Sequence, residues 1–448
     1  MNKIEFGDCR EIMRQWKVQG IKAQMCVTSP PYYGLRDYKT GTWIGGDESC
    51  DHSTSRSRGD DDFKTGDKQS TNSCSRPNTQ LICQCGAIRE DLQIGLEETP
   101  EEYIKAMVEV FRCVWDCLED DGVIWVNIGD SYCGTGDKGD YKDPKHPEGR
   151  NGQSVSTTRK LVGYKQKDLI GIPWMLAFAL RADGWYLRQD IIWHKPNPMP
   201  ESVRDRCGKA HEYIFLLSKS KQYFFDHEAI KDPLAEASKS RMVRGVSDSH
   251  KNVNGAPGQT PHSINQPREH GTITNIPETR NKRSVWTVNT KPYKGAHFAV
   301  FPSELIDPCI LAGTSKKGHC PECGNRWTRK VERTRLRRDE LDPSDPRYRP
   351  NRYNGKYTDI NGKGDAGYSS TKTLGFEAMC ECGHEPVPDV VLDPFMGSGT
   401  TAMVAIKHGR QYMGCELNPD YAELQQERID SMSGIASFHS LFDEADDE

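Results

Sequence analysis

Short apolar runs that end in polar or glycine-rich residues recur along the chain and predict buried strands. Runs of this kind, bounded by turn residues, are typical of strands in the interior of a sheet. They lie at residues 4–6, 25–27, 122–130, 185–193, 211–219, 390–392 and 412–416.

Segments with helical periodicity lie between several of these strands. The clearest one begins at Thr99, a good capping residue, and has Pro100 at its first position. Its apolar residues Tyr103, Met107 and Val114 share one face. Other helices are predicted at 10–16, 169–183 and 402–408, in a segment that ends at Leu311, and after Tyr421. The pattern as a whole predicts an α/β fold.

The stretch from Thr28 to Tyr32 reads Thr-Ser-Pro-Pro-Tyr and follows a predicted strand. Pro31 lacks an N–H, fixes its own φ and keeps Pro30 out of the helical region, so this backbone is stiff and extended. The carbonyls of Ser29 and Pro30 can then face a ligand, beside the Ser29 hydroxyl and the flat ring of Tyr32. Acceptors next to a stacking ring suit an exocyclic amino group on a planar base. The alternative is a proline-capped strand end in an ordinary loop.

A second stretch, residues 390–401, reads as a buried strand, a glycine turn and the start of a helix. Gly397 and Gly399 would let the backbone approach a ligand closely at the N-terminal end of the helix. The next strand ends in Glu416, which is where doubly wound folds place the acid that binds ribose hydroxyls. This context favours a cofactor site over a merely structural turn.

Together, Ser-Pro-Pro-Tyr near the start and Asp-Pro-Phe-x-Gly-Ser-Gly-Thr near the end resemble the amino-group DNA methyltransferases of the permuted β arrangement. In that family the catalytic motif precedes the S-adenosylmethionine motif, and a target-recognition region lies between them. The resemblance implies a doubly wound, Rossmann-like methyltransferase sheet. It also implies S-adenosylmethionine as cofactor and double-stranded DNA as partner.

The same resemblance, with the chemistry of the two stretches, assigns site residues. The catalytic residues would be Ser29, Pro30, Pro31 and Tyr32. The cofactor-binding residues would be Asp8, Cys9, Phe301, Pro302, Asp393, Phe395, Gly397, Gly399, Thr400 and Glu416. Asp8 would accept from the adenine amino group, and it also suits a helix N-cap.

Cysteine turns predict two tetrahedral zinc sites, since short pairs of thiol and imidazole ligands suit that geometry. The first would use Cys50, His52, Cys83 and Cys85, with Cys74 as an alternative ligand. The second, a four-cysteine site, would use Cys320, Cys323, Cys380 and Cys382. His319 and His384 are expected to be bystanders. The alternative for the first set is scattered free cysteines.

These features predict a domain organisation. Residues 1–225 form the catalytic half, with a zinc-bracketed insertion at 40–95, and residues 226–294 form the target-recognition region. Residues 295–312 and 388–435 form the cofactor-binding half, interrupted by a zinc-ribbon-like insertion at 313–387, and residues 436–448 form an acidic tail.

Charge narrows where DNA could bind. The chain of 448 residues carries a net charge of −5, so any DNA-binding surface must be local. Residues 226–294 carry about +4, and residues 313–372, rich in arginine and tyrosine, carry about +7. Both stretches suit contacts to phosphates and bases, and a solvated surface is the alternative for each.

No apolar run approaches the length of a membrane span, and the N-terminus lacks a signal-peptide core. We therefore expect the sixteen cysteines to be in a reducing cytoplasm, where metal ligation is favoured over disulfides. The family resemblance implies a prokaryotic host or a phage as the source. The resemblance leaves a homodimer and a cognate restriction endonuclease open as further partners.

The function predicted from the sequence is methyl transfer from S-adenosylmethionine to the exocyclic amino group of a flipped-out base. Ser29, rather than Asp, at the first motif position favours cytosine N4, and adenine N6 is the alternative. An RNA or protein methyltransferase and a non-catalytic zinc-containing DNA-binding protein are the competing classes.

Overall fold

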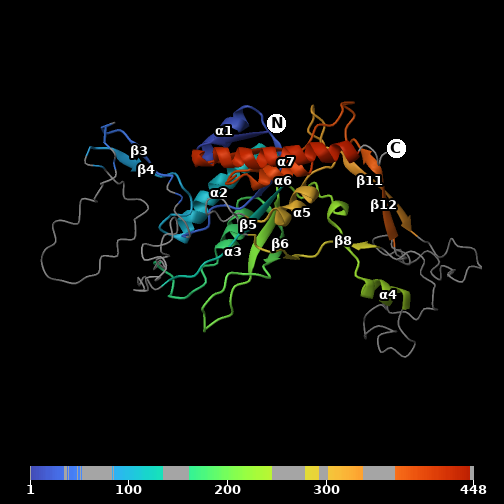
Figure 1. Cartoon of the computed structure of the whole chain (residues 1–448), viewed down its shortest axis with the longest axis horizontal. Helices are drawn as coiled ribbons and strands as arrows, with labels where there is room; N and C mark the ends of the chain where they lie inside the picture. The colour runs from blue at the N-terminus through green and yellow to red at the C-terminus, as the bar shows by residue number, and fades with distance from the viewer. Residues whose placement is uncertain are drawn as a thin grey trace, which may run out of the picture. The chain divides into compact units, whose positions relative to one another are not determined.

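A computed structural model describes residues 2–34, 38, 40–47, 49–50, 52, 83, 85–134, 161–244, 278–291, 301–335 and 369–443 (Figure 1). The chain divides into two compact units. The first comprises residues 1–225, 284–318 and 387–448, and the second comprises residues 226–283 and 319–386.

An eight-stranded sheet forms the centre of the first unit. Its strands, in spatial order, are β1 (Lys3–Phe6), β14 (Gln411–Glu416), β13 (Val390–Asp393), β2 (Ala23–Thr28), β5 (Leu118–Ile128), β7 (His211–Ser218), β6 (Tyr186–His194) and β10 (Val285–Thr287). Only β7 runs antiparallel to its neighbours, β5 and β6, and the other adjacent pairs are parallel. The predicted mixed α/β fold is confirmed at this level.

Helices pack in two groups around this sheet. In one group, α1 (Cys9–Val18) packs on α2 (Pro100–Cys117), which packs on α3 (Ile172–Ala182). In the other, α5 (Ser303–Gly313) packs on α6 (Thr400–Lys407), which packs on α7 (Ala422–Asp443).

The local sequence of helix α2 determines where the helix begins and which face is buried. The Thr99 hydroxyl accepts from the Glu102 N–H, and the Glu102 carboxylate accepts from the Thr99 N–H, each at 3.2 Å. This capping box starts the helix where the sequence predicts. The predicted apolar face is fully buried at Tyr103, Met107 and Val114.

The first unit also holds a small antiparallel hairpin, β3 (Thr42–Ile44) with β4 (Ile88–Glu90). The second unit contains η1 (Glu228–Ile230), α4 (Glu236–Arg244) and two antiparallel pairs. The pairs are β8 (Asp232–Pro233) with β9 (Thr279–Arg280), and β11 (Thr328–Arg335) with β12 (Ser369–Glu377). Within this unit, the Arg329 guanidinium pairs with the buried Asp226 carboxylate at 2.7 Å.

Several sequence-based predictions fall outside the described residues. These are the loop at 135–160, the central part of the recognition region at 245–277, the basic stretch at 336–368, Cys74, and the acidic residues 444–448. Among the described helices, none is both long and apolar enough to span a membrane.

Candidate active site and metal clusters

A cavity opens at the carboxyl edge of the first unit's sheet, where β1, β2, β13 and β14 end. This is the edge at which open α/β sheets bind ligands. Its lining includes the predicted site residues Asp8, Cys9, Ser29, Pro31, Phe301, Phe395, Gly397, Thr400 and Glu416. The structure therefore brings residues of both sequence motifs to one cavity. Pro30, Tyr32, Pro302, Asp393 and Gly399 are not part of this lining.

The glycine turn and the Glu416 carboxylate form one wall of the cavity. Gly397 N–H donates to Glu416 Oε2 at 2.7 Å, and Asn418 N–H donates to Oε1 at 2.9 Å. Gly397 and Gly399 have φ of +53° and +78°, a conformation that favours glycine. Burial raises the pKa of Glu416 to about 7. Two backbone donors fix this carboxylate while its remaining lone pairs stay able to accept from ligand hydroxyls.

Asp8 and Cys9 begin helix α1 beside the turn. The Asp8 carboxylate accepts from the Arg10 N–H at 2.7 Å and pairs with the Arg10 guanidinium. Burial alone would raise the pKa of Asp8, but the hydrogen bonds from Arg10 outweigh it and lower the pKa. The predicted N-cap is confirmed. Burial raises the pKa of the Cys9 thiol to about 12, so this thiol is a packing group.

Asp393 lies beneath the glycine turn. Its carboxylate accepts from the hydroxyls of Thr28 and Thr401, each at 2.6 Å, and from the Phe395 N–H at 3.0 Å. The side chain is fully buried, and burial raises its pKa to about 6. In this structure Asp393 joins the end of β2 to the start of α6 and does not contact the cavity.

Tyr32 is not part of the cavity lining, and its phenol is held by residues of β5 and β7. Its phenol donates to Glu212 Oε2 at 2.7 Å and lies 3.2 Å from Asn127 Oδ1. Burial, with the nearby Glu212 charge, raises the pKa of the phenol well above its ordinary value, so the phenol remains a donor. A Cβ on Gly129 would lie only 2.7 Å from the Tyr32 ring, which is why glycine fits at that position.

Sequence reasoning missed Glu212 as part of this site. Its carboxylate also accepts from Asn127 Nδ2 at 3.3 Å and forms an ion pair with Lys195, and both side chains of that pair are largely buried. The Lys195 ammonium lies 4.2 Å from the centre of the Trp193 ring. The only sequence signal was a charged residue at the start of a strongly apolar strand.

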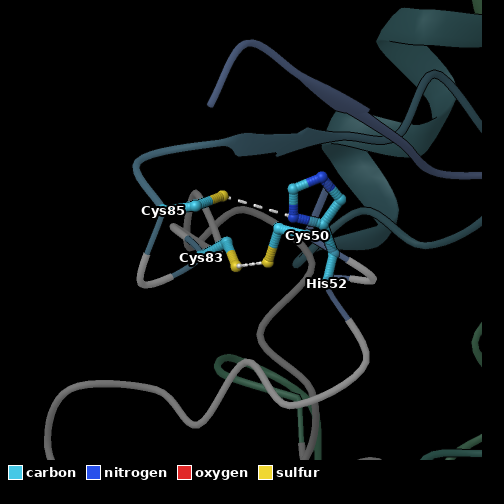
Figure 2. Close-up of side chains that lie close together, drawn as sticks. All are labelled: Cys50, His52, Cys83 and Cys85. Carbon is cyan, nitrogen blue, oxygen red and sulfur yellow. Dashed lines mark hydrogen bonds between the residues drawn. The ribbon is translucent and has the colours of Figure 1, made fainter. Parts of the chain in front are cut away.

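The two predicted metal-ligand sets each converge. In the first, Cys50 Sγ lies 3.6 Å from Cys83 Sγ, and Cys85 Sγ lies 3.4 Å from His52 Nδ1 (Figure 2). All four ligand atoms lie within 4.8 Å of one another. Backbone N–H groups of Asp47 and Ala87 lower the pKa of Cys85 to about 6, which favours the thiolate that binds metal.

The second set lies in the second unit. The sulfur atoms of Cys320, Cys323, Cys380 and Cys382 also lie within 4.8 Å of one another. Backbone N–H groups of Cys323 and Glu322 lower the pKa of Cys320 to about 6. His384 pairs with Glu322 at 3.0 Å and stays outside the cluster.

The fold and the cavity define an α/β protein with a ligand site at the carboxyl edge of a mostly parallel sheet. A family model described as DNA methylase, N6_N4_Mtase, matches residues 23–320 and 380–427. The chain belongs to the N6/N4 DNA methylase family, whose members are amino DNA methyltransferases.

Curated relatives match nearly the whole chain. The type II methyltransferase M.SmaI of Serratia marcescens is 34% identical over 95% of this chain and 90% of its own length. The type II methyltransferase M.Cfr9I of Citrobacter freundii is 32% identical over 94% of this chain and 86% of its own length. Among solved structures, the PvuII DNA methyltransferase (cytosine-N4-specific) aligns with 98% of this chain and 92% of its own. That alignment has 12% identity and a TM-score of 0.43.

Proposed function

We propose that this protein transfers the methyl group of S-adenosylmethionine to the N4 amino group of cytosine in double-stranded DNA. One observation carries the proposal: Ser29 and Pro31 line the same cavity as Gly397 and Glu416. The motif proposed to bind the amino group and the turn proposed to bind the nucleoside therefore line one space.

The residues of the cavity fit the proposed cofactor. Glu416 is a fixed acceptor suited to ribose hydroxyls, and Asp8 is a charged acceptor suited to an adenine amino group. Phe301 and Phe395 add apolar surface to the lining, which suits an adenine ring. S-adenosylmethionine, when bound here, supplies an electrophilic methyl group on a cationic sulfur. We assign the sheet to the doubly wound, Rossmann-like methyltransferase class on this basis.

The Ser29–Tyr32 motif would prepare the acceptor nitrogen. The target base must leave the duplex to reach the cavity. The Ser29 hydroxyl and the Pro30 carbonyl would then accept from the amino hydrogens, and the Tyr32 ring would stack on the base. These bonds would draw the nitrogen toward tetrahedral geometry, so that its lone pair could attack the methyl carbon as the carbon–sulfur bond breaks. A neutral thioether would leave, and the nitrogen would then lose one proton. Catalysis then comes mainly from positioning and charge complementarity.

Ser29 at the first motif position supports cytosine N4, and adenine N6 is the second candidate because the motif serves both bases. Nucleoside mass analysis of methylated DNA distinguishes the two products. We expect N4-methylcytosine. If the product is N6-methyladenine, the proposed mechanism stands but the target base is adenine. A 5-methylcytosine product would contradict the scheme, because that reaction needs a cysteine nucleophile.

We further propose that the enzyme is a type II methyltransferase of a bacterial or phage restriction–modification system. The names of the two relatives support this role. A cognate endonuclease would recognise the same DNA sequence. Methylation of plasmid DNA by this enzyme should then protect it from that endonuclease, and a homodimer can be tested by sedimentation.

We propose zinc at both cysteine clusters, and DNA contacts from residues 226–294 and from the ribbon at 313–387. The family model does not match residues 321–379, which supports an insertion there. Deleting residues 336–368 should weaken DNA binding and spare cofactor binding. Unchanged DNA affinity would contradict a DNA-binding role for the ribbon.

A further inference from the structure

Part of the cavity lining comes from the base of the β3–β4 hairpin, and this part is called the hairpin wall. Tyr38 and Thr40 line the cavity on the segment that leads into β3, and Leu92, Gln93 and Ile94 line it on the segment that follows β4. Four of these residues lie within the insertion at 40–95 and Tyr38 lies just before it, and the sequence motifs did not point to them.

Hydrogen bonds tie the two sides of this wall together. The Tyr38 N–H donates to Gln93 Oε1 at 2.7 Å, and the Thr40 hydroxyl donates to the Asp91 carboxylate at 3.0 Å. One step further, the Gly34 N–H donates to the Gly95 carbonyl at 2.8 Å. The wall is thus joined directly to the end of the Ser-Pro-Pro-Tyr motif.

The hairpin that carries the wall is very small. Its strands pair over three residues each, Thr42–Ile44 with Ile88–Glu90. An isolated two-stranded hairpin of this kind is marginally stable in water. Its two strands are also joined by a long connection, and closing a long loop costs entropy. The hydrogen bonds from Tyr38 and Thr40 support the pair at the end near the cavity.

The first ligand cluster lies at the end of the hairpin away from the cavity. Cys50 and His52 follow β3, while Cys83 and Cys85 precede β4 (Figure 2). A cross-link at this point closes the connection between the strands.

The distances within the cluster fit a tetrahedral metal. Two thiolates bound to zinc at about 2.3 Å lie roughly 3.8 Å apart, and a thiolate and an imidazole slightly less. The observed distances are close to these values: 3.6 Å between Cys50 Sγ and Cys83 Sγ, and 3.4 Å between Cys85 Sγ and His52 Nδ1. The 3.6 Å between Cys50 Sγ and Cys83 Sγ is too long for a disulfide, whose sulfur atoms lie about 2.05 Å apart.

Neighbouring residues hold the ligands in place. The Trp43 ring stacks on the His52 ring with centroids 5.0 Å apart, which orients the imidazole from within β3. Gly46 has φ of +80°, and a Cβ there would lie 2.7 Å from Cys85 Sγ and from the Ala87 backbone. The turn after β3 therefore packs directly on the ligand turn before β4.

We propose that a zinc ion bound by Cys50, His52, Cys83 and Cys85 holds the hairpin closed and thereby builds the hairpin wall of the cofactor cavity. The inference rests on the proposed function, since it assigns the wall to S-adenosylmethionine binding. The metal does no chemistry in the reaction. It acts through Tyr38, Gln93 and their neighbours on the affinity for the cofactor.

The second cluster provides a matched control. Its four cysteines belong to the second unit, and none of them lines the cavity. Replacing Cys380 and Cys382 with serine should remove one zinc ion and leave cofactor affinity unchanged. Replacing Cys83 and Cys85 with serine should also remove one zinc ion, but should weaken S-adenosylmethionine binding by roughly tenfold or more.

The experiment measures zinc by mass spectrometry and S-adenosylmethionine affinity by calorimetry on the full chain. A Cys83→Ser/Cys85→Ser variant that loses its zinc but binds the cofactor like wild type would overturn the inference. A Cys83→Ser/Cys85→Ser variant with the same zinc content as wild type would also overturn the inference. If wild type itself fails to bind S-adenosylmethionine, the proposed function fails instead.

A second measurement tests the inference if the Cys83→Ser/Cys85→Ser variant does not fold. In the Cys380→Ser/Cys382→Ser variant the remaining zinc is that of the first cluster. Stepwise removal by a chelator should lower S-adenosylmethionine affinity in proportion to the zinc lost, and added zinc should restore it. Constant affinity during complete zinc removal would overturn the inference.

Discussion

The Thr28 hydroxyl donates a 2.6 Å hydrogen bond to the buried carboxylate of Asp393, across 365 positions of sequence. Thr28 ends β2, directly before Ser29, and Asp393 ends β13, directly before the glycine turn. The two sequence motifs are therefore held in register by a contact beneath the cavity.

Replacing Thr28 with valine should destabilise the first unit. The substitution keeps the shape but leaves the buried Asp393 carboxylate without one donor, which costs about 1–3 kcal/mol. Urea unfolding checks this value. Thr287→Val, at an exposed position of β10, should cost much less. Equal losses for the two variants would contradict the role given to the Thr28–Asp393 contact.

Cofactor affinity should depend on pH through Glu416. Its pKa of about 7 in the free protein lies above the ordinary value because the carboxylate is buried. Ribose hydroxyls that donate to the carboxylate would lower this pKa in the complex, so binding would release a proton. Affinity should therefore rise with pH and level off above about 7. Calorimetry at several pH values measures the slope.

The Glu416→Gln variant is the control for this pH effect. It removes the titrating group, so its affinity should be lower at pH 8 and nearly independent of pH around 7. If the variant keeps the wild-type slope, another group is responsible.

Replacing Glu212 with glutamine should lower kcat while leaving S-adenosylmethionine affinity unchanged. Glu212 anchors the Tyr32 phenol but does not line the cofactor cavity. Loss of a charged hydrogen bond of about 1.5–3 kcal/mol corresponds to a roughly tenfold to hundredfold fall in rate. Single-turnover kinetics and calorimetry separate the two effects.

Glu201→Gln is a suitable comparison for this experiment. Glu201 also forms an ion pair, with Arg206, but on an exposed surface. Its variant should keep the wild-type rate. A Glu212→Gln enzyme with full activity would contradict the anchoring role.

The sequence predicted most of the features that depend on residues close together along the chain. Apolar runs predicted the buried strands, Gly397 and Gly399 predicted the turn after β13, and the cysteine spacings predicted which residues converge in each cluster. In each case neighbouring residues along the chain determine the geometry, because a strand, a turn or a cysteine pair is defined within a few positions.

The contacts that escaped prediction depend on strand order. Tyr32, Asn127 and Glu212 meet because β7 runs antiparallel beside β5, so the start of β7 lies at the carboxyl edge of the sheet. A parallel arrangement would have put Glu212 at the opposite edge. The contacts of Asp393 also escaped prediction: its place at the end of a strand gives no sign that the Thr28 and Thr401 hydroxyls donate to its carboxylate.

Methylation of mixed-sequence DNA tests the central claim most directly. The purified enzyme is incubated with DNA and labelled S-adenosylmethionine, and the nucleosides are separated and identified by mass. Wild type should yield N4-methylcytosine, and Ser29→Ala and Tyr32→Ala should lose most of that product while still binding the cofactor. No methylated base with wild type, or undiminished product with Ser29→Ala, would contradict the account.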